Sequence, residues 1–239
     1  MSISVVMASY NGAKYISYQI ESILCQLSPE DELIISDDSS TDATLEIISS
    51  FDDKRIHVVH NQGAHGVVNN FENGLNFAKG KYIFLSDQDD VWSEDKTSKI
   101  LPYFQKGYDC VVHDAYITGE TIDSVKGTFF EQRVPRIAFF RNLVRNPYVG
   151  CCMAFDRKIL ERALPFPKGI PMHDSWIGMV AEKFYNVIFL DEPLIYYRRH
   201  GGNASPTTGR SNQSLKKKLM DRFFLLKGLL ERDKILTSQ

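Results

Sequence analysis

The sequence has few cysteines, little net charge and no long apolar run. Its four cysteines, Cys25, Cys110, Cys151 and Cys152, form no C-x-x-C pair, so reduced thiols are expected rather than a disulfide framework. The 28 basic and 30 acidic residues leave a net charge of −2, which creates no overall field to attract nucleic acid. No stretch reaches the ~18 apolar residues that a membrane-spanning helix needs.

Several common motifs are also missing. There is no G-x-x-x-x-G-K-[ST] phosphate loop and no G-x-G-x-x-G fingerprint, which disfavours P-loop NTPases and dinucleotide-dependent oxidoreductases. A serine nucleophile elbow is absent as well. Residues 1–6 lack the basic leader and long apolar run of a signal peptide. We therefore expect a cytoplasmic protein without a nucleic-acid partner.

The first part of the chain alternates between strand and helix patterns. The 239 residues are 43% hydrophobic and 24% charged, which is typical of soluble globular proteins. Apolar runs predict strands over 3–8, 33–35, 56–59 and 82–85. Helical spacing predicts helices over 16–27, 45–48 and 67–78, the last closed by Gly80 as a C-cap. This alternation predicts βαβ units on a mostly parallel sheet.

The second half is less regular. Strands are expected over 110–113, 151–155 and 187–190, and short helical patterns at 137–144 and from about 173. The stretch 117–134 reads as irregular or as a hairpin, and 201–214 as a mobile loop.

Three polar clusters follow the predicted strands of the first half. They lie at 9–11, 36–40 and 86–90. Because ligands bind at the carboxyl ends of the strands in parallel α/β sheets, we expect the three clusters to share one ligand site.

The last of these clusters contains three carboxylates, Asp87, Asp89 and Asp90. Like charges at one strand end cost free energy unless a cation neutralises them. Mg²⁺ or Mn²⁺ would suit such oxygen ligands and would also bridge substrate phosphates. The alternative is a solvated acidic turn before the helix that holds Ile100. The two other polar strand ends favour the cation site.

Asp38 ends the second predicted strand. A carboxylate at this place can accept the N–H of a uracil or thymine ring. The alternative is an N-cap arrangement, since serine, threonine and aspartate precede the next helix.

Three segments together resemble family 2 glycosyltransferases, which are inverting enzymes with the GT-A fold. They are VVMASYNG at 5–12, SDDSSTD at 36–42 and LSDQDDVW at 85–92. The HDSW sequence at 173–176 resembles the acceptor-side acidic motif of the family, and YRRHGGNAS at 197–205 resembles the motif after its last core strand. The DQDDVW form and the Y-R-x-H-G-x-N segment are similar to bacterial polysaccharide enzymes, rhamnosyltransferases among them.

The resemblance implies a fold and a domain division. The fold would be α/β of the GT-A (Rossmann-like) type, a mixed, mostly parallel sheet flanked by helices, with a C-terminal helical extension. Residues 1–205 would form the GT-A domain, with a nucleotide-sugar-binding half at 1–110 and an acceptor half at 111–205. Residues 206–239 would form a flexible loop and an amphipathic basic helix.

The resemblance also implies roles for single residues. Ala8, Ser9 and Tyr10 would line the base, Asp38 would hold the pyrimidine N–H, and Asp87 would lie near the ribose or a water on the metal. Asp89 would bind Mn²⁺ or Mg²⁺, and His200 would close the metal or diphosphate site. The candidates for acceptor or phosphate contacts are Asp90, His173, Trp176, Arg198 and Arg199. His173 stands where the family often has glutamate, so its role is open between tuning its neighbour and touching the acceptor.

Asp174 matches the catalytic base of the family. Inversion in one displacement needs a general base on the acceptor side, and Asp174 lies at a predicted helix start. The helix dipole is expected to lower its pKa. The alternative for this residue is a structural N-cap.

The expected function is inverting, metal-dependent transfer of a sugar from a UDP- or dTDP-sugar to a glycan or lipid-linked glycan acceptor. The setting would be bacterial surface polysaccharide or glycoprotein glycan synthesis. One rival is a sugar nucleotidyltransferase, but its usual Gly- and Arg-rich loop is represented at 9–14 by one glycine and one lysine. The other is a noncatalytic nucleotide-sugar or glycan-binding partner.

The end of the chain predicts an amphipathic basic helix. One face carries Leu215, Leu219, Phe223, Leu226 and Leu230, and residues 215–239 have seven Lys or Arg against three Asp or Glu. Such a helix packs on its own domain, pairs with a second subunit in a homodimer, or lies on an anionic membrane surface as a peripheral contact at the inner face of the cell membrane. The sequence leaves these alternatives open.

Overall fold

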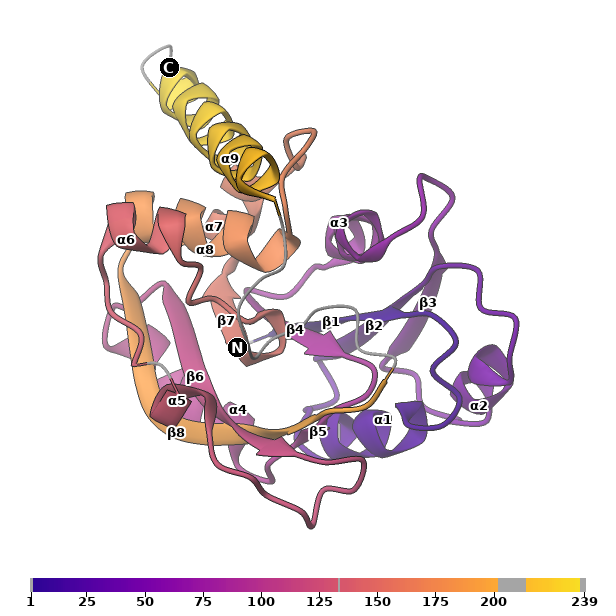
Figure 1. Cartoon of the computed structure of the whole chain (residues 1–239). Coiled ribbons are helices and arrows are strands. Elements are labelled where there is room, and N and C mark those ends of the chain that lie inside the picture. Colours follow the sequence, from indigo (N-terminus) through magenta and orange to yellow (C-terminus); the bar gives the residue numbers. More distant parts are fainter. Residues whose placement is uncertain (1, 133, 202–213, 237–239) are drawn as a thin grey trace.

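An eight-stranded sheet forms the centre of the molecule (Figure 1). The computed structural model describes residues 2–132, 134–201 and 214–236. The strands are β1 (Ile3–Ser9), β2 (Glu32–Asp37), β3 (Ile56–His60), β4 (Tyr82–Asp87), β5 (Val91–Trp92), β6 (Cys110–Thr118), β7 (Met153–Asp156) and β8 (Val187–Arg198). The helices are α1 (Ile16–Leu24), α2 (Thr44–Ser49), α3 (Val67–Phe77), α4 (Lys96–Gln105), α5 (Phe129–Gln132), α6 (Phe139–Val144), the 3₁₀ turn η1 (Gly150–Cys152), α7 (Arg157–Ala163), α8 (His173–Phe184) and α9 (Leu215–Leu236).

The sheet is mixed and mostly parallel, which confirms the prediction. Its order is β3-β2-β1-β4-β7-β6-β8-β5. The first four strands in this order pair in parallel, as do β6 and β8, whereas β7 and β5 run the other way. The carboxyl ends of β1, β2 and β4 therefore meet at one edge.

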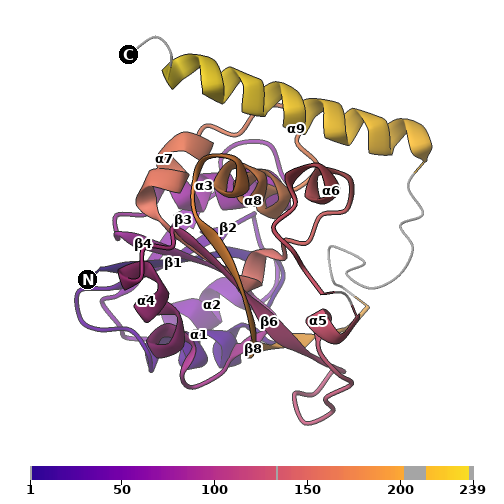
Figure 2. The same ribbon diagram turned by 90° about the vertical axis from the view of Figure 1, so that its left-hand side faces the viewer.

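Helices cover both faces of the sheet (Figure 2). α1, α2 and α4 lie on one face, and α3, α7 and α8 lie on the other. The central strands β1, β2 and β4 are buried on both faces, which is why their sequences are nearly continuous apolar runs.

The structure differs from the sequence prediction at several places. α3 ends at Phe77 with Ala78 extended, so Gly80 is not its C-cap. A Cβ at Gly80 would lie 2.5 Å from the backbone nitrogen of Ser4, so this glycine lets the chain pass close to β1. β8 continues to Arg198, beyond the expected 187–190, and the short strand β5 was not predicted. Beyond residue 190, β8 pairs with β6, which runs to Thr118 instead of the expected 113, and β5 pairs with β8. These differences therefore come from contacts between segments far apart in the sequence.

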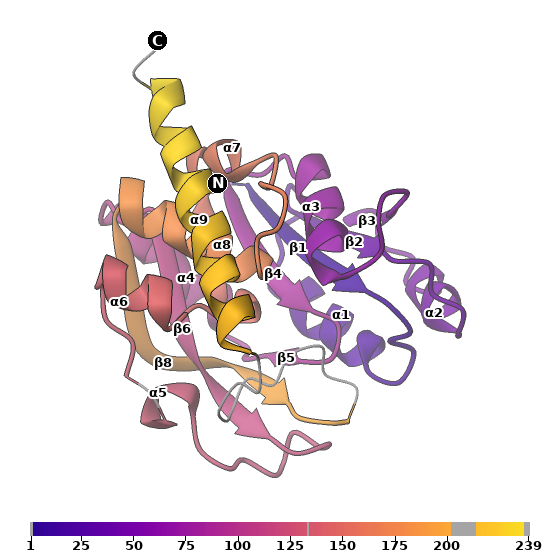
Figure 3. The same cartoon turned by 45° about the horizontal axis from the view of Figure 1, so that its top comes forward.

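The terminal helix α9 runs across the outside of α6 and α8 (Figures 2 and 3). It packs through Leu225, Gly228 and Leu229, which are buried. A Cβ at Gly228 would lie 2.7 Å from Pro167 and 2.9 Å from Trp176, so glycine permits this close approach. The C-terminal helical extension is thus confirmed, although its predicted apolar face is not the face that packs.

Two other expectations concern membrane-spanning helices and the loop before α9. No helix within the described ranges combines the length and the hydropathy needed to cross a membrane. The loop expected at 201–214 and the end of the YRRHGGNAS motif fall on 202–213, outside the described residues.

Candidate active site

The three polar strand ends come together, as the sequence predicted. Ser9 is in register with Asp37, and Ala8 is in register with Asp87 on the opposite side. They border a pocket of about 640 Å³, a size that is ordinary for small-molecule sites. Of the residues expected in the site, the pocket wall includes Ala8, Ser9, Tyr10, Asp38, Asp87, Asp89, His173 and Asp174.

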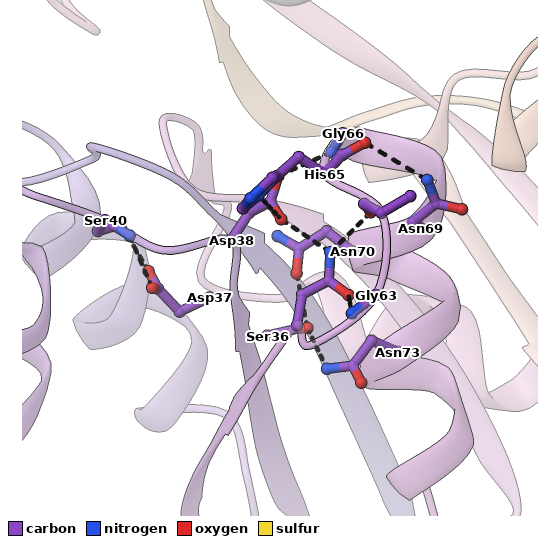
Figure 4. A network of polar contacts seen from close by, with 12 residues as sticks. Ser36, Asp37, Asp38, Ser40, Gly63, His65, Gly66, Asn69, Asn70 and Asn73 are labelled. Atoms are coloured by element: carbon purple, nitrogen blue, oxygen red, sulfur yellow. Dashed lines mark hydrogen bonds and ion pairs between the residues drawn. The ribbon is translucent and has the colours of Figure 1, made fainter.

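Asp38, in the wall of the pocket, is the centre of a hydrogen-bond network (Figure 4). One carboxylate oxygen accepts hydrogen bonds from Asn61 Nδ2 at 2.7 Å and lies 3.0 Å from His65 Nδ1. The other accepts the Gly66 N–H at 2.8 Å. Burial opposes ionisation, but these hydrogen bonds outweigh it and hold the pKa of Asp38 below its ordinary value. The wall of the pocket therefore contains a fixed, ionised carboxylate.

The partners of Asp38 were not predicted from the sequence. Asn61, His65 and Gly66 follow β3 and reach the same sheet edge, so the signal for them was a third polar segment after a strand. A second part of the network ties α3 to the sheet, because Asn70 and Asn73 both bond to the Ser36 hydroxyl (Figure 4).

Gln88 joins the ends of β1 and β4, and it too was missed. Its side-chain oxygen accepts the Tyr10 N–H, and its amide donates to the Tyr10 carbonyl, both at 2.9 Å. A Cβ at Gly12 would lie 2.1 Å from the Gln88 oxygen. Glycine at this position therefore makes room for the bridge.

The acidic cluster at the end of β4 favours proton or cation binding. Burial, together with the charges of Asp89 and Asp174, raises the pKa of Asp87 to about 7. Burial and the neighbouring carboxylates also raise the pKa of Asp90 well above its ordinary value. One Asp90 oxygen accepts the Arg198 N–H at 3.0 Å, and the other is buried without a partner in the described part of the chain. Such a cluster gains free energy from a divalent cation.

The two residues expected to bind the metal are in contact. His200 Nε2 lies 2.8 Å from Asp89 Oδ2, and the His200 ring lies 4.8 Å from the Tyr15 ring. Asp87, Asp90 and Cys151 also bring potential ligand atoms within 4.8 Å of one another. A hydrogen bond with Cys152 and burial raise the pKa of the Cys151 thiol, and a neutral sulfur is a poor ligand for Mg²⁺ or Mn²⁺. The carboxylate oxygens fit these cations better.

Two buried cations hold this region. Arg198 donates to the carbonyl oxygens of Asp89 and Glu120, at 2.9 and 2.7 Å, and packs over the Tyr15 ring. Its guanidinium thus fixes the turn that carries the carboxylates, and a phosphate contact stays a prediction. Lys96, which was not singled out in the sequence, is fully buried and donates to the Cys151 carbonyl at 2.9 Å.

Asp174 lies in the first turn of α8, as predicted. Its carboxylate accepts the Ser175 N–H at 2.5 Å, and the Gly150 N–H and the Asn146 side chain also bond to it. Burial nevertheless raises its pKa to about 6. The pKa decrease expected from the helix dipole is therefore wrong, because desolvation of the carboxylate outweighs the dipole and the hydrogen bonds.

The other acceptor-side candidates differ in position. The His173 ring stacks on Phe71 at 3.8 Å, and burial lowers its pKa to about 3, so the ring is neutral. Trp176 is fully buried, and its indole N–H donates to the Ala163 carbonyl. Neither Trp176 nor the buried Asp90 is part of the pocket wall. Arg199 is exposed at the end of β8. The acceptor or phosphate contacts expected of Trp176 and Asp90 stay predictions.

Comparison with proteins of known sequence gives a consistent result. The family model described as Glycosyl transferase family 2 matches residues 4–164. The chain is 37% identical over 214 residues to the UDP-Glc:alpha-D-GlcNAc-diphosphoundecaprenol beta-1,3-glucosyltransferase WfaP of Escherichia coli, covering 85% of this chain and 79% of WfaP. It is 30% identical over 193 residues to WfgD of Escherichia coli, which bears the same enzyme name, covering 78% of this chain and 72% of WfgD.

Solved structures show the same fold. Staphylococcus aureus TarS 1–349 in complex with UDP-GlcNAc aligns with a TM-score of 0.68 at 19% identity, over 97% of this chain and 72% of that one. In another crystal structure of TarS 1–349 the alignment covers 60% of that chain. The mannosyltransferase PcManGT from Pyrobaculum calidifontis, in complex with GDP-Man and Mn²⁺, aligns with a TM-score of 0.62 at 17% identity, over 99% of this chain and 74% of that one.

These findings confirm the GT-A type of fold. The family match also begins in β1 and ends just after α7, so it contains all three polar strand ends that border the pocket. The chain therefore belongs to glycosyl transferase family 2.

Proposed function

We propose that this glycosyltransferase inverts configuration as it moves a sugar from a UDP- or dTDP-sugar to a glycan or lipid-linked glycan. Bacterial surface polysaccharide or glycoprotein glycan synthesis would be its setting. The observation that carries the proposal is one pocket whose wall contains Asp38 with its network as well as Asp87, Asp89 and Asp174. This arrangement suits a nucleotide diphosphate sugar, with a base recognised at one end and transfer at the other.

The donor half of the proposal rests on the strand ends. Asp38, kept ionised by its network, would accept the pyrimidine N–H, while Ala8, Ser9 and Tyr10 would line the base and Asp87 would lie near the ribose. In support, WfaP and WfgD are named for UDP-Glc, and TarS was solved with UDP-GlcNAc.

Asp89 and His200 would hold Mn²⁺ or Mg²⁺. The contact between them and the raised pKa of Asp87 support a cation at this end, and PcManGT was solved with Mn²⁺. When bound, the cation would supply positive charge for the leaving diphosphate. Arg198 would hold the carboxylates in place through its hydrogen bonds to Asp89 and Asp90.

Asp174 would act as the general base. With a pKa of about 6 it is mostly ionised at neutral pH, yet more basic than an ordinary aspartate. It would take the proton of the acceptor hydroxyl while the acceptor oxygen bonds to the sugar carbon and the diphosphate leaves from the opposite face. The Asn146 and Gly150 contacts would orient its carboxylate. Neutral His173 would tune this base or touch the acceptor.

The acceptor is the least constrained part of the proposal. WfaP and WfgD are named for an acceptor on diphosphoundecaprenol, which favours a lipid-linked acceptor for this chain. We assign donor binding to the half at 1–110 and acceptor binding to the half at 111–205, with Arg199 as a candidate phosphate contact. The cytoplasmic location stays a prediction.

A thermal-shift panel tests this function. UDP- and dTDP-sugars, each with and without Mn²⁺, are added to the wild type and to Asp89→Ala, since a ligand of the native state raises the melting temperature. We expect one donor to give a shift that requires Mn²⁺ and is lost in Asp89→Ala. No shift with any donor would contradict the proposal. Binding without transfer or hydrolysis would favour the noncatalytic alternative, and release of pyrophosphate from a nucleoside triphosphate would favour a nucleotidyltransferase.

A further inference from the structure

Large apolar side chains are exposed together on the outside of α6 and α9. On α9 they are Leu215, Leu219, Phe223, Leu226 and Leu230, and at α6 they are Ile137, Phe140 and Val144. Phe140 is 79% exposed and Phe223 62%. The two helices are in contact, because Arg222 donates to the Val144 carbonyl at 2.6 Å. Single exposed apolar residues are ordinary, whereas a set of this size on adjoining helices indicates a binding surface.

Packing within the domain does not use these side chains. α9 is anchored through Leu225, Gly228 and Leu229. At 3.6 residues per turn, the exposed apolar stripe points about 120° away from that buried face. The same holds for α6, where Asn142 is buried while Phe140 and Val144 face outward. The described residues of the domain therefore leave the stripe uncovered.

Positive charge accompanies the stripe. The α9 sequence has seven Lys or Arg against three Asp or Glu, in a chain whose net charge is −2. Lys216, Lys227 and Lys234 are exposed and recur with helical periodicity, so they line one border of the stripe. Lys227 also lies 4.0 Å from Glu231, an exposed ion pair of a kind that contributes little to stability. Arg141 adds an exposed cation on α6.

This combination favours lipid over protein as the occupant. Apolar side chains bordered by lysines match a bilayer surface whose headgroups are anionic and whose interior is apolar. Lysine is depleted from protein–protein interfaces, and two copies meeting through this face would bring their lysine borders together.

The surface adjoins the acceptor side of the pocket. Val144 is followed two residues later by Asn146, whose side chain bonds to the Asp174 carboxylate. Two peptide units span at most ~7.6 Å, so the outward end of α6 lies close to the residue that orients the base.

We propose that α6 and α9 together form a docking surface for an anionic lipid bilayer. The apolar stripe enters the headgroup region, and the bordering lysines meet lipid phosphates. If the proposed lipid-linked acceptor is correct, this contact also brings the pocket to the membrane where such an acceptor is anchored. Docking itself rests on the surface and not on that function.

Vesicle co-sedimentation of the full chain tests the proposal. One set of vesicles is phosphatidylcholine alone, and the other contains about one-third phosphatidylglycerol as the anionic lipid. We expect binding to the anionic vesicles that weakens with salt. The double variant Leu219→Ser with Phe223→Ser should bind at least about tenfold more weakly, because it removes two large apolar side chains from the surface that enters the headgroup region. Phe77→Ser, which removes an exposed aromatic residue on α3, is the matched control and should bind like the wild type.

Two further measurements separate the outcomes. The Mn²⁺-dependent thermal shift with donor should be unchanged in the double variant, so loss of docking and failure of the proposed function are distinguishable. Light scattering reports the oligomeric state. Absence of binding to anionic vesicles, equal binding by the double variant, or a dimer that the double variant abolishes without any vesicle binding would each overturn the proposal.

Discussion

Removing the charge of Asp174 should stabilise the protein while abolishing transfer. Burial raises the pKa of this carboxyl from 3.8 to about 6, so the folded protein holds an ionised group in surroundings that favour its protonated form. A rise of this size corresponds to about 3 kcal/mol of unfolding free energy lost at neutral pH. Asp174→Asn keeps an oxygen that can accept the Ser175 N–H. We therefore expect the variant to gain up to about 3 kcal/mol.

The gain in unfolding free energy should depend on pH in a direction that follows from the raised pKa of Asp174. Because the folded-state pKa is raised, the cost of the ionised carboxylate is fully present above pH ~6 and is relieved as pH falls through that value. The difference in unfolding free energy between Asp174→Asn and the wild type should therefore fall to about half of its neutral value at pH ~5, and approach zero at still lower pH.

Urea unfolding followed by tryptophan fluorescence in EDTA, at pH values from about 5 to 8, measures this difference. Asp191→Asn, an exposed position on β8, is the control and should leave stability nearly unchanged at every pH. Transfer by Asp174→Asn should drop by several orders of magnitude. A variant that is less stable than the wild type, or whose gain does not vary with pH, would refute the idea that burial primes this carboxylate.

Three other predictions address separate parts of the molecule. Because the pKa of Asp87 is raised to about 7, Mn²⁺ must displace a proton below neutral pH, and calorimetry should show affinity falling as pH drops from about 8 to 6; a constant affinity would contradict this. Asp38→Asn should weaken UDP binding about tenfold in the same assay, since it removes a charge-assisted acceptor, and unchanged binding would place the base elsewhere. Gly228→Leu should cost ~1–3 kcal/mol in urea unfolding through overlap with Trp176, whereas Lys227→Leu at the neighbouring exposed position should not.

The sheet was largely predictable because its central strands are fixed by local sequence. Short β-branched runs between helical patterns gave β1, β2, β3 and β4 to within two residues at each end. β5 and the second halves of β6 and β8 were missed, because these segments become strands by pairing with one another across about 80 to 105 residues of sequence. For α9 the sequence showed an apolar face, but a small residue, Gly228, decided which face packs.

The site was predictable in its main residues and not in its supports. The resemblance pointed to Asp38 and Asp174, which lie in the pocket wall, and to Asp89 and His200, which are in contact. Gln88 lies within the DQDDVW motif but was given no role, and His65 and Lys96 belong to no recognisable motif. The direction of the pKa shift of Asp174 was predicted wrongly. The shift comes mainly from burial, and burial depends on the segments that cover a residue and not on its own helix.

The pairing of β5 with β8 determines when the acidic turn can fold as the chain is made at the ribosome. β1 to β4 are complete by residue 87, so the donor half can begin to fold while the rest is still being made. The Asp90 carboxylate, however, accepts the backbone N–H of Arg198, and Val91 pairs with Tyr196. The acidic turn thus waits for more than one hundred further residues before it is held in place. If this turn binds a cation as proposed, a nascent chain would gain that ability late, after β1 to β4 are complete and only once β8 has emerged.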